Sequence, residues 1–240
     1  MTSHSRPVLP LWVAWCLVLG LAFAANLLNN ELLTRWYILT GPAAAAVLLV
    51  VARWAGLGWD DLGLARRTWR VGLAWAGVII VVVTSAYAAV ALFPPTRGLF
   101  EDDRVGATSS GALLFTVLVR IPFGTVLLEE TLFRGVLLGL GARTMGWWRS
   151  AVLSSALFGI WHVLPSRGAA DSNPTVVAVV EAGGGFGVPL AIAAAVVGTG
   201  LSGLLFCWLR LRSGSLLAPI GLHLATNSVG YLTAYFVLRG

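Results

Sequence analysis

Lysine is absent from this chain, and charged residues of every kind are scarce. All 16 basic residues are arginines, and charged side chains make up 11% of the sequence, whereas a soluble domain carries roughly 25%. Hydrophobic residues make up 58%. This balance excludes an ordinary soluble domain and indicates a chain that crosses a lipid bilayer several times.

Cysteine is also scarce, with only Cys16 and Cys207. Both lie within apolar runs, so we expect neither a disulfide framework nor a thiolate metal site. The net charge of +6 could attract nucleic acid, but the arginines stand singly or in pairs at the ends of apolar runs. That distribution is typical of topology determinants, so we expect a lipid bilayer as partner and no nucleic acid.

Seven apolar runs follow one another along the 240 residues. The runs cover residues 8–28, 36–54, 71–93, 111–140, 147–164, 188–209 and 215–238. At roughly 20 residues per span, the length allows about seven or eight transmembrane helices. We therefore predict an all-α, polytopic transmembrane helical bundle that forms one integral-membrane domain over residues 1–240. The first run continues past Ala22-Phe23-Ala24, so we expect a span there rather than a cleaved signal peptide.

The arginines also predict the orientation of the chain. With seven spans, one side of the membrane holds Arg6, Arg53, Arg66, Arg67, Arg70, Arg143, Arg149, Arg210 and Arg212, and the other holds Arg35, Arg97, Arg104, Arg167 and Arg239. Positive residues concentrate in cytoplasmic loops. We therefore predict a multi-pass protein of the cell (inner or plasma) membrane with a cytoplasmic N-terminus.

Charged residues do interrupt the fourth apolar run. Glu129, Glu130 and Arg134 lie there, although a charged side chain near the bilayer centre costs roughly 2.5–3.5 kcal/mol. Glu130 and Arg134 are four residues apart, so a helix would bring them together as an ion pair. Glu129 points about 100° away from Glu130 and is free to face a cavity. Such a cluster indicates a functional site. We expect the remaining charge of this run, Arg120, to extend toward the membrane surface rather than line the cavity.

Two further pairs lie four residues apart in later runs, Phe158 with His162 and His223 with Asn227. Counted from the predicted span ends, Glu129, His162, His223 and Asn227 lie at a similar depth, roughly 14–21 Å from the inner surface. We therefore expect these four side chains to line one cavity.

A carboxylate, two imidazoles and a carboxamide can supply the base, the acid and the hydrogen-bond donors that amide hydrolysis needs. The same residue types also form proton relays, so a proton-coupled transporter is an alternative. Transporters commonly carry internal repeats, and no repeat is visible here. Clustering of the polar groups at one level therefore favours hydrolysis.

The motifs Glu129-Glu130-x-x-x-Arg134, Phe158-x-x-x-His162 and His223-x-x-x-Asn227 occur in this order on three predicted spans. They resemble the three motifs of the CPBP family, the CAAX-processing and bacteriocin-processing intramembrane endopeptidases, also called Abi proteins. The resemblance covers residues 111–238, which it identifies as the catalytic core. It implies hydrolysis of a peptide bond within or near the cytoplasmic side of the membrane. The implied substrate is a peptide or protein, including lipidated or membrane-anchored ones.

The resemblance also implies roles for individual residues. Glu129 and His162 would activate water, while His223 and Asn227 would stabilise the oxyanion. The implied supporting residues are Glu130, Arg134 and Phe158. Because two histidines and one glutamate are a common zinc-binding set, a zinc protease with Glu129, His162 and His223 as ligands is an alternative. We favour metal-independent catalysis without a cofactor. A non-catalytic membrane protein or bacteriocin-immunity protein is the remaining alternative.

Overall fold

The computed structural model describes residues 8–100, 103–106, 108–169 and 174–239, and within these ranges the chain is helical and has no β-strand. The α-helices are α1 (Leu11–Leu27), α2 (Tyr37–Trp54), α3 (Trp69–Leu92), α4 (Pro94–Arg97), α5 (Asp103–Gly106), α6 (Ser110–Phe115), α7 (Leu127–Glu129), α8 (Leu138–Met145), α9 (Trp147–Trp161), α10 (Val163–Ala169), α11 (Pro174–Ala182), α12 (Gly187–Ser213), α13 (Leu217–Leu224) and α14 (Gly230–Val237). The π-helical segments are η1 (Leu28–Leu32), η4 (Thr116–Val126), η5 (Glu130–Leu137) and η7 (Ala225–Val229). The 3-10 turns are η2 (Arg66–Thr68), η3 (Gly98–Phe100) and η6 (Gly184–Phe186). The predicted all-α class is confirmed.

Five helical stretches of the described chain are long and apolar enough to cross a membrane. They are Leu11–Leu32, Tyr37–Trp54, Arg66–Leu92, Ser110–Met145 and Gly184–Ser213. Helix α9 has 15 residues, fewer than the roughly 20 that a span needs. The run from α13 to α14 carries the polar His223 and Asn227 within its length. The chain is thus a multi-pass membrane protein, and five of its seven predicted runs can span on their own.

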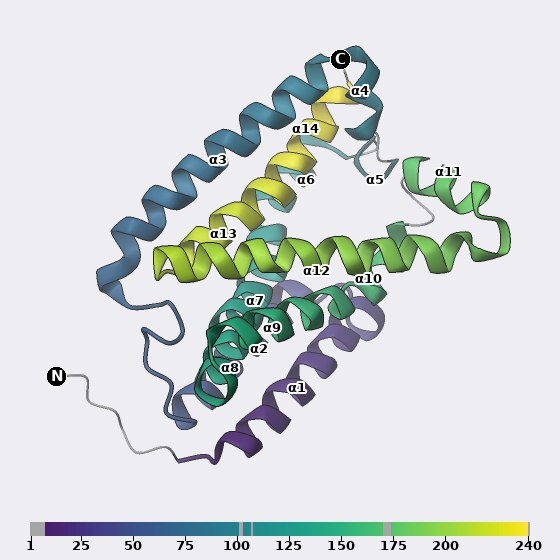
Figure 1. Cartoon of the computed structure of the whole chain (residues 1–240). Helices are drawn as coiled ribbons and strands as arrows, with labels where there is room; N and C mark the ends of the chain where they lie inside the picture. The colour runs from purple at the N-terminus through teal and green to yellow at the C-terminus, as the bar shows by residue number, and fades with distance from the viewer. Residues whose placement is uncertain (1–7, 101–102, 107, 170–173, 240) are drawn as a thin grey trace.

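Glycines let neighbouring helices approach one another closely. Helices α3 and α13 run side by side (Figure 1), and a Cβ at Gly221 of α13 would lie 2.5 Å from the Ala76 Cβ of α3. Helix α12 crosses α9, where a Cβ at Gly159 would lie 2.5 Å from the carbonyl oxygen of Val196. Small residues at helix interfaces are a common packing device in membrane bundles. Helices α9, α12 and α13 also each contact the fourth-span helix (Ser110–Met145), which carries the acidic pair.

The main buried apolar cluster joins α1, α2, α9 and the fourth-span helix. Its members include Val18 of α1, Leu48 of α2, Leu132 and Val136 of the fourth-span helix, and Phe158 of α9. Leu128, one position before Glu129, also belongs to it. This cluster fixes the rotation of the fourth-span helix, and with it the directions in which Glu129 and Glu130 point.

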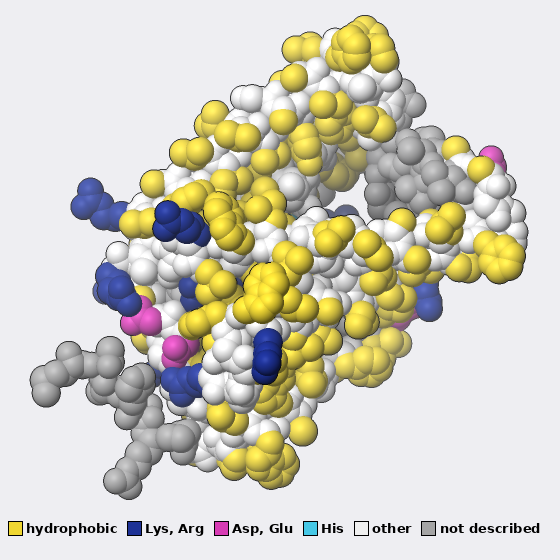
Figure 2. Space-filling view, in the orientation of Figure 1, with side chains coloured by type: hydrophobic (Ala, Val, Ile, Leu, Met, Phe, Trp, Pro, Cys, Tyr) yellow, Lys and Arg dark blue, Asp and Glu magenta, His cyan; other side chains and the backbone are white. Residues whose placement is uncertain are grey.

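Three arginines of the predicted arginine-rich side meet at one loop, which carries Asp60 and Asp61. Arg143 pairs with Asp61 at 2.8 Å, and Arg67 pairs with Asp60 at 2.6 Å. The Arg210 guanidinium donates to the backbone oxygens of both aspartates, at 2.9 and 3.0 Å. Figure 2 shows most of the arginines visible on this face near the start of α3, while hydrophobic side chains cover much of the rest. Three of the arginines predicted to share one side of the membrane therefore lie together, whereas Arg6 lies outside the described residues.

Candidate active site

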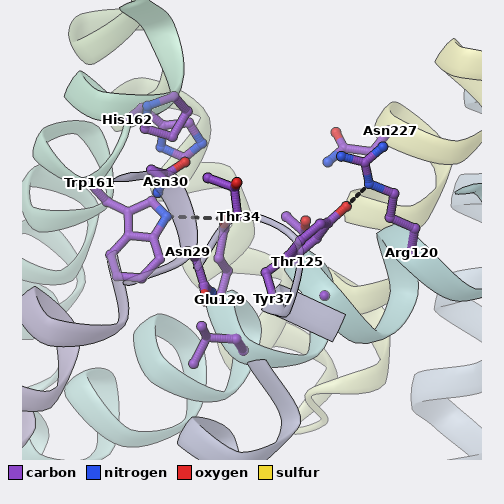
Figure 3. A pocket seen from close by; sticks show the side chains of 13 residues that line it. Asn29, Asn30, Thr34, Tyr37, Arg120, Thr125, Glu129, Trp161, His162 and Asn227 are labelled. Atoms are coloured by element: carbon purple, nitrogen blue, oxygen red, sulfur yellow. Dashed lines mark hydrogen bonds between the residues drawn. The ribbon is translucent and has the colours of Figure 1, made fainter. Parts of the chain in front are cut away.

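A cavity of about 530 Å³ lies between the fourth-span helix, the end of α9, η7 and the connection from α1 to α2. Its lining residues are Asn29, Asn30, Thr34, Tyr37, Arg120, Gly124, Thr125, Leu128, Glu129, Trp161, His162, Pro165 and Asn227. Figure 3 shows Trp161 and His162 on one side of the cavity, and Arg120 and Asn227 on the other. Polar groups are costly inside a membrane protein, so a cavity with this lining indicates a functional site.

Glu129 is buried, and its two carboxylate oxygens have different surroundings. The indole N–H of Trp161 donates to Glu129 Oε1 at 3.0 Å, which fixes the orientation of the carboxylate (Figure 3). No group in the described part of the chain forms a hydrogen bond with Glu129 Oε2. Unpartnered buried oxygens are rare in folded proteins and call for an explanation such as a catalytic role. This oxygen is available to accept a proton.

His223 lies between the two carboxylates. Its Nδ1 is 2.8 Å from Glu130 Oε1, and its Nε2 is 3.8 Å from Glu129 Oε2. Because an ionised carboxylate can only accept a hydrogen bond, Nδ1 carries the hydrogen in this contact. The sequence led us to expect His223 on the cavity wall, but it is not among the lining residues. It lies behind Glu129, where the fully buried Glu130 holds it.

Arg134 and Glu130 form the expected ion pair, with 3.2 Å between Arg134 Nη1 and Glu130 Oε1. Both side chains are completely buried. The guanidinium also lies between two aromatic rings, with its Cζ 4.0 Å from the Phe158 ring centroid and 4.4 Å from that of Phe206. Cation–π contacts of this kind stabilise a desolvated arginine. The Phe158 ring thus packs on Arg134 and does not line the cavity.

His162 follows the last residue of α9 and lines the cavity. Its Nδ1 is 2.8 Å from the carbonyl oxygen of Phe158. Since a carbonyl oxygen only accepts, the Nδ1 atom donates, and in the neutral ring Nε2 is then the acceptor. Glu129, His162 and Asn227 therefore meet around one cavity, as the sequence analysis expected for these three residues.

The end of the first span contributes a wall that the sequence analysis did not identify. Asn29 and Asn30 line the cavity, and Asn30 Nδ2 donates to Asn26 Oδ1 at 2.7 Å. Asn26 Nδ2 in turn donates to the carbonyl oxygen of Trp161 at 3.1 Å. Asn26 and Asn30 are four residues apart in a mostly apolar run. This is the same spacing as in the three motifs, and it could have identified this wall.

The expectation for Arg120 is wrong. Instead of extending away from the site, Arg120 lines the cavity, and its Nε donates to the Tyr37 hydroxyl (Figure 3). The guanidinium Cζ also lies 5.1 Å from the centroid of the Tyr37 ring. The hydropathy of the fourth run could not reveal this, because Tyr37 comes from another helix.

The zinc alternative requires three ligands to converge. Within the described residues, no group of three or more His, Cys, Asp or Glu side chains is arranged to hold a metal ion. His223 Nδ1 is held by Glu130 and His162 Nδ1 by a backbone carbonyl, which leaves Nε2 as the available nitrogen of each ring. The feature that counts against a zinc centre is therefore the arrangement of the three side chains and not the chemistry of the individual donors.

The cavity lies at the end of α1 that is remote from the N-terminus. Helix α1 begins at Leu11, and the same helical stretch reaches Leu32 before the chain turns into α2. The lining residues Asn29, Asn30 and Thr34 all belong to this far end. The cavity therefore lies near the end of the first helical stretch that is opposite the start of α1.

Comparison with known proteins gives one finding. The family model described as type II CAAX prenyl endopeptidase Rce1-like matches residues 109–229, which is half of the chain. Neither the search of curated proteins nor that of solved structures returned a match. The matched segment includes all three motifs and ends before α14.

Proposed function

The chain belongs to the Rce1-like family of type II CAAX prenyl endopeptidases, and we propose that it is an intramembrane peptidase that uses a Glu129-activated water. The family supports peptidase activity, while the catalytic mechanism rests on the geometry of the site. By its name, this family acts on CAAX prenyl proteins, in which a prenylated cysteine lies near the C-terminus. We propose a membrane-anchored peptide of this kind as the substrate.

The carboxylate of Glu129 is the observation that carries this proposal. Trp161 holds one oxygen, and the other has no hydrogen-bond partner among the described residues. In the proposed reaction, this carboxylate takes a proton from water as the water oxygen bonds to the scissile carbonyl carbon. The carbon–nitrogen bond then breaks, and the leaving nitrogen receives a proton. The products are a new carboxylate and a new amine.

His162 and Asn227 act from the other walls of the cavity. In the proposed mechanism, His162 exchanges protons together with Glu129, and its bond to the Phe158 carbonyl keeps the ring in one orientation. The Asn227 carboxamide donates to the developing oxyanion without adding charge to the membrane interior. Both residues line the same cavity as Glu129, which supports these roles.

His223 has a positioning role in this proposal. The family resemblance implied that His223 stabilises the oxyanion, but its buried ring contacts Glu130 and faces Glu129. From that position its Nε2 faces Glu129 Oε2 at 3.8 Å, while Glu130, paired with Arg134, holds the His223 ring. Asn227 then provides the oxyanion contact without His223.

We propose catalysis without a metal, because no three of the described His, Cys, Asp and Glu side chains are arranged to hold one. Elemental analysis of the purified protein tests this directly. Zinc at one equivalent in the wild type, lost in both Glu129→Ala and His223→Ala, would establish the zinc alternative. A folded and active protein without stoichiometric metal supports the proposal.

We also propose seven crossings and a cytoplasmic N-terminus in the cell (inner or plasma) membrane. The grouping of Arg67, Arg143 and Arg210 around one loop supports a single cytoplasmic face. With that orientation, the cavity extends toward the outer face. This proposed placement differs from the hydrolysis within or near the cytoplasmic side that the family resemblance implies, and the labelling experiment described in the Discussion distinguishes the two.

The proposed activity is tested by cleavage of an S-farnesylated CAAX peptide by purified protein in detergent. Glu129→Gln keeps the shape of the side chain but removes the base, so we expect a loss of about 10²- to 10⁴-fold in kcat. Glu181→Gln is the matched control, because it removes an exposed carboxylate on α11. Undiminished cleavage by Glu129→Gln would overturn the mechanism, whereas absence of cleavage by the wild type would favour the transporter alternative.

A further inference from the structure

Arg120 is a cation in the cavity without a neutralising partner in the protein. The arginine–carboxylate ion pairs among the described residues are Arg67–Asp60, Arg134–Glu130, Arg143–Asp61 and Arg167–Glu31. Arg120 belongs to none of them, although it lies within the fourth-span helix. A charge within a membrane span is costly, and its retention indicates a function. The mechanism proposed above does not use this charge.

The position of Arg120 is set by its surroundings. Tyr37 accepts a hydrogen bond from Arg120 Nε and lies beside the guanidinium. The Tyr37 ring packs directly on Gly124, where a side-chain carbon would overlap the ring. A hydrogen bond through Nε leaves the two terminal nitrogens of the guanidinium for an anion, which they can bind in bidentate fashion.

The spacing between Arg120 and Glu129 fits a short peptide. They are nine positions apart on one helix, which corresponds to at most about 13 Å along its axis. An extended peptide covers about 3.3–3.6 Å per residue, so three residues reach about 10–11 Å. A peptide whose scissile carbonyl lies at Glu129 can therefore place its C-terminal carboxylate near Arg120.

We propose that Arg120 binds the free C-terminal carboxylate of the substrate and that Tyr37 positions it for this contact. This inference rests on the proposed peptidase function and adds a specificity-determining residue to it. The contact selects peptides cleaved a few residues from their C-terminus. It also supplies the counter-ion that Arg120 lacks within the described protein.

The test uses two S-farnesylated CAAX peptides that differ only in a C-terminal acid or a C-terminal amide. We expect the wild type to cleave the acid peptide with a kcat/KM about 10- to 100-fold higher than the amide peptide, because only the acid forms a charge-assisted contact with Arg120. Arg120→Gln should bring the acid-to-amide ratio of kcat/KM close to one, mainly by raising the KM of the acid. Arg120→Lys should restore part of the preference.

Arg149→Gln is the matched control, because it removes an exposed arginine at the start of α9, outside the cavity. Equal cleavage of acid and amide by the wild type would overturn the role of Arg120 and leave the peptidase function intact. This comparison does not depend on the folding of any variant. Cleavage of neither peptide would count against the proposed function. Titration calorimetry with the acid and amide forms of the three-residue product would then decide the role of Arg120, because equal affinities would overturn it.

Discussion

Trp161 donates its indole N–H to Glu129 Oε1 at 3.0 Å, so the residue before His162 holds the carboxylate that lies across the same cavity. The backbone oxygen of Trp161 is itself held by Asn26 of α1. A chain of contacts thus runs from the first helix to the proposed base. The positions of Glu129 and His162 are coupled through one side chain.

Trp161→Phe should lower kcat by about tenfold or more with little change in KM, because the lost hydrogen bond ends on a charged oxygen. Steady-state kinetics with the farnesylated peptide measures this effect. Trp148→Phe is the control, since Trp148 lies on the same helix and is 74% exposed. Equal activity of Trp161→Phe and the control would show that Glu129 does not need this contact.

Arg134→Leu should destabilise the protein by about 3–5 kcal/mol, because Glu130 would keep a buried charge without its cation. Adding Glu130→Gln should recover part of the loss, since the unpaired carboxylate is then removed. Denaturant unfolding of the purified variants measures both changes. Arg212→Leu controls for the loss of an exposed arginine. A double variant as unstable as Arg134→Leu would argue that cation–π packing, rather than the ion pair, is what the site needs.

Gly159→Ala should destabilise the contact between α9 and α12 by about 1–3 kcal/mol, because its methyl group would meet the Val196 carbonyl oxygen. Activity should fall as well, since Gly159 is three residues from His162. Thermal unfolding and kinetics report the two effects. Gly198→Ala on α12 is the control, with no atom within 4 Å of the added carbon. Equal melting temperatures for the two variants would contradict this interface.

Cysteine labelling tests the orientation of the cavity. In a background with Cys16→Ala and Cys207→Ala, Thr34→Cys should react with a membrane-impermeant maleimide on intact cells. Arg67→Cys should react only after the cells are permeabilised, because it lies in the arginine-rich region. The opposite pattern would place the N-terminus outside and the cavity on the cytoplasmic side.

Parts of the site could be predicted from the sequence because they depend on spacing within one helix. The ion pair of Glu130 and Arg134 follows from a separation of four residues, and it is present. Glu129 points away from Glu130 and reaches the cavity, as one helical step predicts. The all-α membrane class followed from composition alone. None of these three predictions required knowing which helices are neighbours in the fold.

The rest depends on which helices become neighbours, and periodicity does not encode that. His223 is held by Glu130, so its position could be known only once α13 was placed against the fourth-span helix. The contact of Arg134 with Phe206 requires α12, which carries no motif. The π-helical segments add a second obstacle, because η4, η5 and η7 depart from the 3.6-residue period on which helical faces are calculated.

The cavity wall from the first two helices has a consequence for how this protein could be altered. The family match covers residues 109–229, but Asn29, Asn30, Thr34 and Tyr37 lie before it. The segment with the motifs thus forms only part of the cavity wall, and the end of α1, the turn after it and the start of α2 supply the rest. Substitutions at these four residues should change which peptides are cleaved while the motif residues remain unchanged.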